Sequence, residues 1–320
     1  MNRIWKEIGI AFLMGMVLPG LLLHLAVALK NDAEESIPVT EPSVQTEEML
    51  TVPVLMDDGR VREMELDKYI TGVVLAEMPA SFETEALKAQ SVVARTYALR
   101  AHGGKSKHEG ASVCTDSACC QGYRELDDYR SGGGMEENIR KVQNAVMGTS
   151  GYVLTYEGEL IEATYFSCSG GYTEDAVAVW GTDVPYLKAV SSPGEENAAH
   201  YTDETRFTRR ELEERLEVQL LSDGGDWFSD MTYTAGGGIE QMRIGGKLFK
   251  GTELRKLLGL RSTAFAVTVE NDHIIFKTRG FGHRVGMSQY GADAMAVEGH
   301  TYREILMHYY PGTILEYRTD

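Results

Sequence analysis

Residues 66–101 have the sequence LDKYITGVVLAEMPASFETEALKAQSVVARTYALRA, which predicts two successive helices. Asp67 is a favourable N-cap for a first helix through Ala76, and Pro79 ends that helix because it restricts the residue before it. Apolar side chains recur at helical spacing over about residues 83–101 and form a broad face, which predicts a second helix. The proline thus separates two expected helices within a short stretch of chain.

Strands and shorter helices are expected around this pair. Residues 51–56 and 61–64 flank an Asp-Asp-Gly turn signal and predict a hairpin. Similar patterns predict strands at 152–156, 159–165, 265–269 and 273–277. Capping signals and helical periodicity predict further helices at 139–147, after Thr208, at 252–258 and at 288–298. Helices and strands mix without regular alternation, so the predicted class is α+β with antiparallel strands.

The composition disfavours some functional classes. The chain has 320 residues, of which 43% are hydrophobic, and it can therefore bury a sizeable core. It has 48 acidic and 31 basic residues, which gives a net charge of -17. Such a field repels nucleic-acid phosphates and anionic lipid surfaces, although a local basic groove is still compatible with it.

The N-terminal residues predict a membrane segment. Residues 8–29 contain no acidic or basic side chain except His24, and about 20 apolar residues span a hydrocarbon core of roughly 30 Å. Arg3 and Lys6 precede this run, which places the N-terminus in the cytoplasm and the rest of the chain outside. Residues 26–28, Ala-Val-Ala, resemble a signal-peptide cleavage site, but the length of the apolar run favours an uncleaved anchor.

Three regions are therefore expected along the chain. Residues 1–30 form a cytoplasmic tip and a single transmembrane anchor. Residues 31–49 form an acidic linker that contains two prolines and little periodicity. Residues 50–320 form the folded, extracytoplasmic part of the protein.

Glu77 is the acidic residue at the expected end of the first helix, next to Met78-Pro79. Burial against apolar groups raises the pKa of a carboxyl group, which lets it hold a proton at neutral pH. A glutamic acid in that state can act as the general acid in glycosidic cleavage. Taken alone, a solvated glutamate at a helix end is the simpler interpretation.

The cysteines indicate a possible metal site. The chain has Cys114, Cys119, Cys120 and Cys168, and four cysteines in an exported chain allow three disulfide pairings. Three of them are crowded into one short segment close to His108, which suits a metal better than loop-closing disulfides. The spacing is not that of a zinc finger. A Cys114–Cys120 disulfide and unreactive buried thiols are the alternatives.

Five blocks of sequence occur in an order that is typical of one bacterial family. They are residues 69–98, YFSCSGGYTE at 165–174, VWG with PYL between 179 and 187, GFGHRVGMSQYGA at 280–292, and ILMHYYPG at 305–312. Together they resemble the stage II sporulation protein D family, which includes amidase-enhancer proteins of cell-wall turnover. The resemblance covers about residues 50–317 and implies a catalytic region arranged around a substrate groove.

The resemblance implies lytic transglycosylase activity on peptidoglycan, with the catalytic acid at Glu77. One carboxyl group would protonate the oxygen between N-acetylmuramic acid and N-acetylglucosamine. The carboxylate would then deprotonate the sugar's own 6-hydroxyl, which closes a 1,6-anhydro ring without water. Hydrolysis by paired carboxylates needs a second acid, but this reaction does not. Glu83 and Glu85 fit the first turn of a helix, where acids are favoured.

Arg95 is expected to approach Glu77 from the second helix. Its guanidinium would bind a substrate carboxylate or hydroxyl, or stabilise the ionised Glu77. A surface arginine is the alternative interpretation, and the family resemblance favours the functional one.

The resemblance also implies one zinc ion, held by His108, Cys114 and Cys120, with a structural rather than catalytic role. Cys120 is preferred to Cys119 because Cys120-Gln121-x-Tyr123 continues the family pattern. Cys168 could supply a fourth ligand only if the fold brings it close.

The glycine-rich block at 280–291 lacks the Lys-Ser/Thr ending of a P-loop. Its glycines are expected to let the backbone approach a glycan closely. His283, Ser288 and Gln289 would then offer hydrogen bonds to sugar hydroxyl or acetamido groups, and Tyr172 is a candidate for stacking on a sugar ring. A structural role is the alternative for each of the four.

Three functional classes follow. The first is a transglycosylase of the cell membrane that acts on septal peptidoglycan during endospore engulfment, with a cell-wall amidase and an integral membrane scaffold as partners. The second is a non-catalytic amidase activator or glycan-binding module. The third is a zinc hydrolase, which needs a general base near the metal, such as Glu109 or Asp116.

Overall fold

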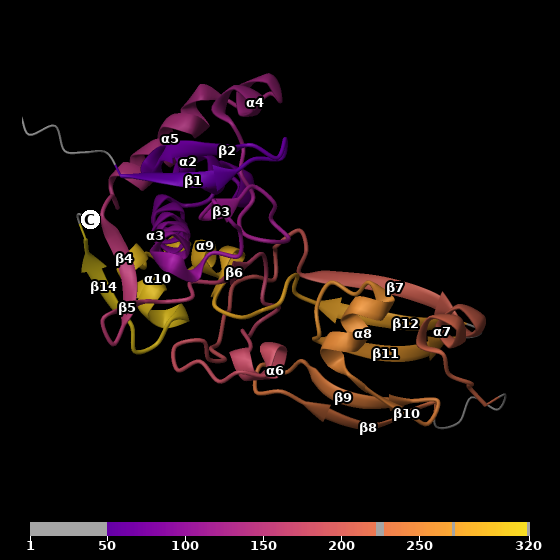
Figure 1. Cartoon of the computed structure of the whole chain (residues 1–320). Helices are drawn as coiled ribbons and strands as arrows, with labels where there is room; N and C mark the ends of the chain where they lie inside the picture. Colours follow the sequence, from indigo (N-terminus) through magenta and orange to yellow (C-terminus); the bar gives the residue numbers. More distant parts are fainter. Residues whose placement is uncertain (1–49, 222–226, 271–272, 319–320) are drawn as a thin grey trace, which may run out of the picture. The chain divides into compact units, whose positions relative to one another are not determined.

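The computed structural model describes residues 50–221, 227–270 and 273–318 (Figure 1). The chain divides into Met1–Glu48 and a compact unit, Met49–Asp320. The anchor and linker expected at 1–30 and 31–49 lie outside the described residues and stay predictions. Among the residues that are described, no helix is both long enough and apolar enough to cross a membrane.

The two predicted helices are α2 (Leu66–Glu77) and α3 (Thr84–Arg100). They pack in the larger of two hydrophobic cores together with α5 (Glu136–Met147), α9 (Gln289–Val297) and α10 (Tyr302–Tyr309) (Figure 1). α3 is buried along most of its length and contacts all four of the others. Each large apolar side chain buried here contributes roughly 1.5–3 kcal/mol to folding. This core holds the ends of α2 in place.

The two ends of α2 are formed differently from one another. The prediction that Asp67 is the N-cap is wrong. Glu65 takes that position without a side-chain cap bond, and Asp67 lies in the first turn. At the other end Met78 is extended (φ -126°, ψ 142°), the conformation that a following proline imposes. The helix therefore stops at Glu77, as the sequence predicts to within one residue.

Short sheets surround the helices of this core. β1 (Thr51–Leu55) pairs antiparallel with β2 (Val61–Glu65) and parallel with β3 (Val113–Cys114). β4 (Tyr152–Tyr156) lies between β14 (Ile314–Tyr317) and β5 (Glu159–Leu160). The shorter helices are η1 (Ala101–Lys105), α4 (Leu126–Ser131) and α6 (Ala176–Trp180).

The strand predicted at 159–165 is divided in the structure. Its first residues form β5, whereas its last residue begins β6 (Tyr165–Phe166), which pairs parallel with β13 (Met287–Ser288). This pairing joins two segments that are far apart in the sequence, and it places Tyr165 beside the glycine-rich block.

Residues 202–279, which we call the lobe, form a second hydrophobic core of their own. One sheet has the order β11-β12-β7, and the other has the order β10-β9-β8. Two helices pack with these sheets, and the capping box predicted at Thr208 is confirmed at the start of α7. The bounds of the lobe's elements are β7 (Thr202–Thr208), α7 (Arg209–Leu216), β8 (Phe228–Tyr233), β9 (Ile239–Ile244), β10 (Lys247–Lys250), α8 (Gly251–Leu258), β11 (Phe265–Glu270) and β12 (His273–Arg279).

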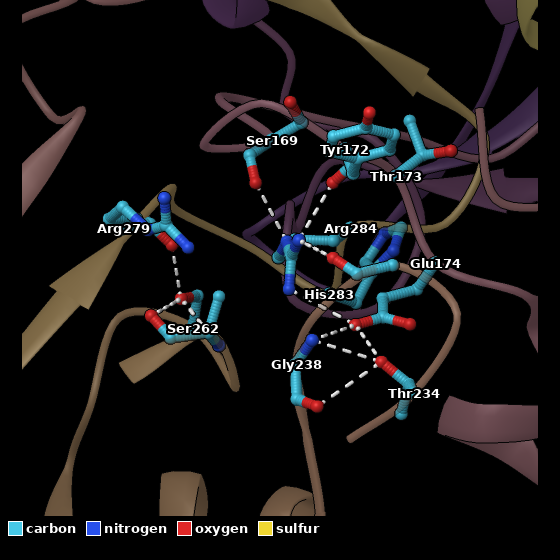
Figure 2. A network of polar contacts seen from close by, with 12 residues as sticks. Ser169, Tyr172, Thr173, Glu174, Thr234, Gly238, Ser262, Arg279, His283 and Arg284 are labelled. Atoms are coloured by element: carbon cyan, nitrogen blue, oxygen red, sulfur yellow. Dashed lines mark hydrogen bonds and ion pairs between the residues drawn. The ribbon is translucent and has the colours of Figure 1, made fainter. Parts of the chain in front are cut away.

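A buried arginine connects the lobe with the rest of the folded unit. Arg284 donates to Glu174 (3.1 Å), and both side chains are almost completely buried. The same guanidinium donates to the backbone oxygens of Ser169 and Tyr172, as Figure 2 shows, and also to the oxygen of Gly236 in the lobe. Arg284 itself has a positive φ of 67°, which is unfavourable for a residue with a side chain. Its four hydrogen bonds offset that strain.

The structure confirms a mixed α+β fold with antiparallel sheets. Antiparallel pairs connect most of the strands, and the two parallel pairs are only two residues long. The short parallel pairs position the start of the loops that follow β3 and β6, and the start of α9, which follows β13 directly.

Candidate active site

Glu77 lines a cleft of about 850 Å³. Its Oε1 accepts a hydrogen bond from the backbone N–H of Gly122 at 2.6 Å. A Cβ atom on residue 122 would lie only 2.9 Å from that oxygen, so a glycine is required for this close approach. The loop after the cysteines therefore holds the carboxyl group through a backbone donor.

The surroundings of Glu77 change its acidity in two directions. Burial raises the pKa of its carboxyl group, while donors from Gly122, Tyr165 and Gln289 oppose that rise. Among the described hydrogen bonds, the one to this carboxyl group comes from the Gly122 N–H, and the Tyr165 hydroxyl and the Gln289 amide are nearby donors. The position at the C-terminal end of α2 acts with burial, since the helix dipole is negative there. The result is a carboxyl group that keeps its proton longer than an exposed glutamic acid.

A hydrogen-bonded chain orients Tyr165 toward Glu77. The Tyr69 hydroxyl donates to Gln121 Oε1 (3.3 Å), and Gln121 Nε2 donates to the Tyr165 oxygen (3.4 Å). Because that oxygen accepts from Gln121, the hydrogen of the Tyr165 hydroxyl is available for Glu77. Burial keeps the pKa of Tyr165 well above its usual value, so the hydroxyl stays protonated.

The walls of the cleft combine aromatic and charged side chains. Trp180, at the end of α6, and Phe281 are exposed to 44% and 38%, although large apolar side chains are usually buried. Among the described residues that line the cleft, the lysine is Lys107, and the carboxylates are those of Glu77 and Glu162. Flat aromatic surfaces beside a few polar groups are typical of a site for an amphipathic ligand such as a sugar chain.

His283 lines the same cleft as a neutral imidazole. Its Nδ1 accepts from the backbone N–H of Val285 at 3.1 Å, which places the ring hydrogen on Nε2. Burial, with a smaller effect from the charge of Arg255, lowers the pKa of His283 to about 4. A hydrogen bond to the Tyr165 backbone opposes that shift. The ring lies 5.4 Å from the Trp180 ring between centroids and supports that wall of the cleft.

The predicted metal ligands are together. The ligand atoms of His108, Cys114, Cys119 and Cys120 all lie within 4.8 Å of one another. All four cysteines of the chain are free thiols, so the alternative Cys114–Cys120 disulfide is not formed. Burial raises the pKa of the Cys114 thiol to about 12, and the neighbouring thiols act in the same direction. One imidazole with crowded thiols fits zinc, which binds nitrogen and thiolate sulfur and lowers the pKa of its ligands.

Cys168 is not part of this cluster. Its Sγ lies 3.1 Å from Glu195 Oε2, in a buried network that also includes Ser169. Burial, reinforced by the neighbouring Glu195, raises the pKa of the Cys168 thiol. The fold does not bring Cys168 close to the other cysteines, so Cys168 is not a fourth metal ligand.

We expected Arg95 to approach Glu77, and it does not. Its Nη2 forms a 2.9 Å ion pair with Asp67, at the opposite end of α2. The guanidinium also donates to the backbone oxygens of Val146, Thr149 and Tyr152. Glu77 is ten positions after Asp67 in the helix, which corresponds to about 15 Å. Arg95 is therefore a buried connection between α2, α3 and the end of α5, and its geometry gives no support to a catalytic role.

Two of the residues predicted to bind substrate do not line the cleft. Ser288 is fully buried and caps α9, where its hydroxyl accepts from the N–H of Gly291. Tyr172 is 54% exposed outside the cleft, and Arg284 holds its backbone oxygen (Figure 2). His283 and Gln289 are the two that lie at the cleft, together with Glu77.

Sequence reasoning missed the residues that contact or face Glu77 from other segments. Tyr165 lies in a recognised block and Gly122 is the unspecified position of Cys120-Gln121-x-Tyr123, but nothing in the local pattern indicates that they meet Glu77. Glu162 belongs to the segment predicted as a strand, and its carboxylate lies 3.6 Å from Arg100. The cleft that Glu77 lines therefore contains a second carboxylate, which the sequence analysis did not predict.

Comparison with known proteins agrees with these sequence blocks. A family model described as Stage II sporulation protein matches residues 57–156, which include Glu77 and the cysteine cluster. The stage II sporulation protein D of Bacillus amyloliquefaciens is 40% identical over 278 residues, 85% of this chain and 80% of that protein. The protein of the same name from Bacillus subtilis (strain 168) is 39% identical over 293 residues, 88% of this chain and 85% of that protein.

An amidase enhancer of Bacillus subtilis (strain 168) is more distantly similar. It is 29% identical over 302 residues, which cover 77% of this chain and 40% of that protein. The near-complete coverage of the two sporulation proteins, at about 40% identity, settles the relationship. The chain belongs to the stage II sporulation protein D family.

Proposed function

We propose that this protein is a lytic transglycosylase that cleaves the bond between N-acetylmuramic acid and N-acetylglucosamine in peptidoglycan. The observation that supports it most directly is Glu77, a largely buried carboxyl group at the cleft with a raised pKa and a backbone donor. A single group of this kind can first give a proton and then take one back.

In the first step, protonated Glu77 gives its proton to the glycosidic oxygen, and the bond from that oxygen to C1 of the muramic sugar breaks. In the second step, the Glu77 carboxylate removes the proton of the same sugar's 6-hydroxyl, whose oxygen bonds to C1. The proton given in the first step is thus recovered, and no water is consumed. Gly122 donates to the carboxylate between the two steps, and the nearby Tyr165 hydroxyl would add a second donor.

The cleft offers contacts for such a substrate. Trp180 and Phe281 present partly exposed rings that can pack on the apolar faces of sugars. Gln289 has a buried amide nitrogen without a described partner, and a substrate acetamido oxygen would satisfy it. The neutral imidazole of His283 closes the wall beside Trp180.

The protein would act outside the cell, held by its N-terminal anchor, on septal peptidoglycan during engulfment in sporulation. The family resemblance leads us to propose a cell-wall amidase that removes stem peptides and an integral membrane scaffold as its partners. Zinc bound by the His108 cluster would supply a rigid cross-link within the loop next to Glu77, and the proposed proton transfers do not use it.

Two other functions are kept as alternatives. Glu162 could serve as the second carboxylate of a hydrolase, although it is partly exposed and close to Arg100. The similarity to an amidase enhancer supports a non-catalytic activator. The chain aligns with less than half of that protein, and this weakens the second alternative.

The experiment is digestion of peptide-stripped glycan strands, followed by mass spectrometry of the new ends. We expect 1,6-anhydro-muramic ends from the parent protein and none from Glu77→Gln. Reducing ends that depend on Glu162 or on metal would instead indicate hydrolysis. Absence of cleavage together with faster turnover by an added amidase would indicate the activator.

A further inference from the structure

We infer that Cys119 is a fourth metal ligand, which closes the site and makes the metal a structural anchor for the loop that reaches Glu77. The metal part of this inference stands on the cysteine cluster alone. Only the statement that the loop serves catalysis rests on the proposed function.

The distances among His108, Cys119 and Cys120 are close to those of a tetrahedral site, and the Cys114 sulfur lies within 4.8 Å of each of them. His108 Nε2 lies 3.3 Å from Cys120 Sγ and 3.6 Å from Cys119 Sγ, and the two sulfurs are 4.0 Å apart. Zinc–sulfur and zinc–nitrogen bonds of about 2.3 Å and 2.0 Å at tetrahedral angles give roughly 3.5 Å between N and S, and about 3.8 Å between sulfurs. Cys119 fits these spacings as well as Cys120 does.

The loop conformation explains how neighbouring cysteines can face one centre. The N–H groups of Cys119 and Cys120 both donate to the backbone oxygen of Asp116, at 3.0 Å and 2.8 Å. This double acceptor tightens the turn so that both thiols lie on the side of His108. Cys114 enters the cluster from β3, which is itself paired with β1. The four donors therefore come from three separate short segments.

A charge argument agrees with four ligands. Three thiolates and a neutral imidazole around Zn²⁺ give a net charge of about -1. The ammonium of Lys107 donates to the backbone oxygen of Cys119 at 2.8 Å and supplies a compensating charge next to the cluster. Backbone and charged partners of this kind commonly orient metal ligands from outside the coordination sphere.

A closed site assigns a role to the metal. Three protein ligands leave a position for water or substrate, whereas four protein ligands leave none, as in structural zinc sites. The residues that follow Cys120 are those that reach the active site. Gln121 bonds the hydroxyl groups of Tyr69 and Tyr165, and the N–H of Gly122 bonds Glu77. Fixing Cys119 and Cys120 therefore fixes the donors around Glu77.

The first test measures metal coordination in the full chain with cobalt(II) as the probe. We expect four-coordinate absorption from the parent protein and no change when azide is added. Cys119→Ser should lose about a third of the sulfur-to-cobalt absorption, bind the metal at least about tenfold more weakly, and respond to azide because a position has opened. Cys120→Ser should behave in the same way. Cys168→Ser should match the parent, since its thiol lies outside the cluster.

Two results would overturn the inference. One is a parent protein whose cobalt spectrum already responds to azide and is unchanged in Cys119→Ser, because that describes an open three-ligand site. The other is a purified protein whose clustered thiols are oxidised and bind no metal. Neither result depends on glycan cleavage, so failure of the proposed function would be seen separately.

The second test measures hydrogen exchange after the metal is removed with a chelator. We expect faster exchange at the amide of Gly122 and in its flanking residues, with little change in the buried middle of α3. Unchanged exchange at Gly122 would show that the metal does not hold this loop, whatever its coordination. Restoring zinc should restore the protection.

Discussion

Each end of helix α2 has a carboxylate, and the two carboxylates have different surroundings. Asp67, in the first turn, is paired with Arg95 and also accepts from the Ser150 hydroxyl. Glu77, at the last residue, makes no ion pair within the described part of the chain and is met by a backbone N–H from a distant loop. The helix dipole stabilises a negative charge at the first end and opposes it at the second. The role of each acid is therefore set by which segments reach it.

The largest expected effect comes from removing the proton donor. Glu77→Gln should reduce glycan cleavage by about 10²–10⁴-fold, the usual contribution of a general acid or base. Because an amide can still accept from Gly122, the fold should be unchanged, which circular dichroism can check. Retention of more than a tenth of the activity would contradict the role assigned to Glu77.

The opposite end of the helix should affect stability instead. Arg95→Met leaves Asp67 without its ion pair and removes one donor from each of three backbone oxygens, which should cost about 3–5 kcal/mol of unfolding free energy. Urea unfolding measures this cost, and cleavage should be compared per folded molecule. If Arg95→Met instead kept its stability and lost activity as Glu77→Gln does, Arg95 would regain the catalytic role that the sequence predicted for it.

A change at Gly122 tests the backbone donor. The Cβ of Gly122→Ala would press against the flexible end of the Glu77 side chain, so the carboxyl group moves while the core stays intact. We expect a loss of about 10–100-fold in cleavage, because small displacements of reacting groups are costly. The melting temperature should change little. A large drop in stability with normal activity would show that Gly122 matters only for packing.

The raised pKa of Glu77 also predicts a pH-dependent stability. Below the unfolded pKa both states are protonated and the residue adds no cost. As pH rises from the unfolded to the native pKa, the unfolded state releases its proton first, so the fold loses stability over that range. Glu77→Gln should thus match the parent in thermal melts near about pH 4 and exceed it toward neutral pH.

Glu304→Gln serves as a control of opposite sign. The backbone hydrogen bond from Thr301 lowers the pKa of Glu304, which stabilises the fold above the unfolded pKa. Removing that charge should lower the melting temperature toward neutral pH. The same direction of change in both variants would contradict the assignment.

The smallest effect is expected at the second carboxylate of the cleft. Glu162→Gln should lower cleavage by less than about tenfold and leave the anhydro ends unchanged, since one group suffices for both proton transfers. Mass spectrometry of the products decides this. A loss comparable to that of Glu77→Gln, or reducing ends from the parent that disappear in Glu162→Gln, would favour a mechanism with two carboxylates.

The cysteine cluster shows how far sequence reasoning reached. Crowding in one short segment was enough to predict a metal site near His108, and the ligand atoms do converge. The family pattern favoured Cys120 over Cys119, yet both sulfurs are at similar distances from His108. A spacing pattern cannot distinguish neighbouring residues, because the turn around Asp116 decides which thiols face inward.

Local patterns in the sequence alone determined the positions of α2 and α3, the stop at Pro79, and hence the place of Glu77 at a helix end. They do so because periodicity, capping and the restriction before proline act over a few residues. Only the tertiary structure decided that Arg95 lies at the far end of α2, and that Gly122 and Tyr165 surround Glu77. Those contacts join residues many positions apart through loops and two short parallel strand pairs, whose packing no local pattern encodes.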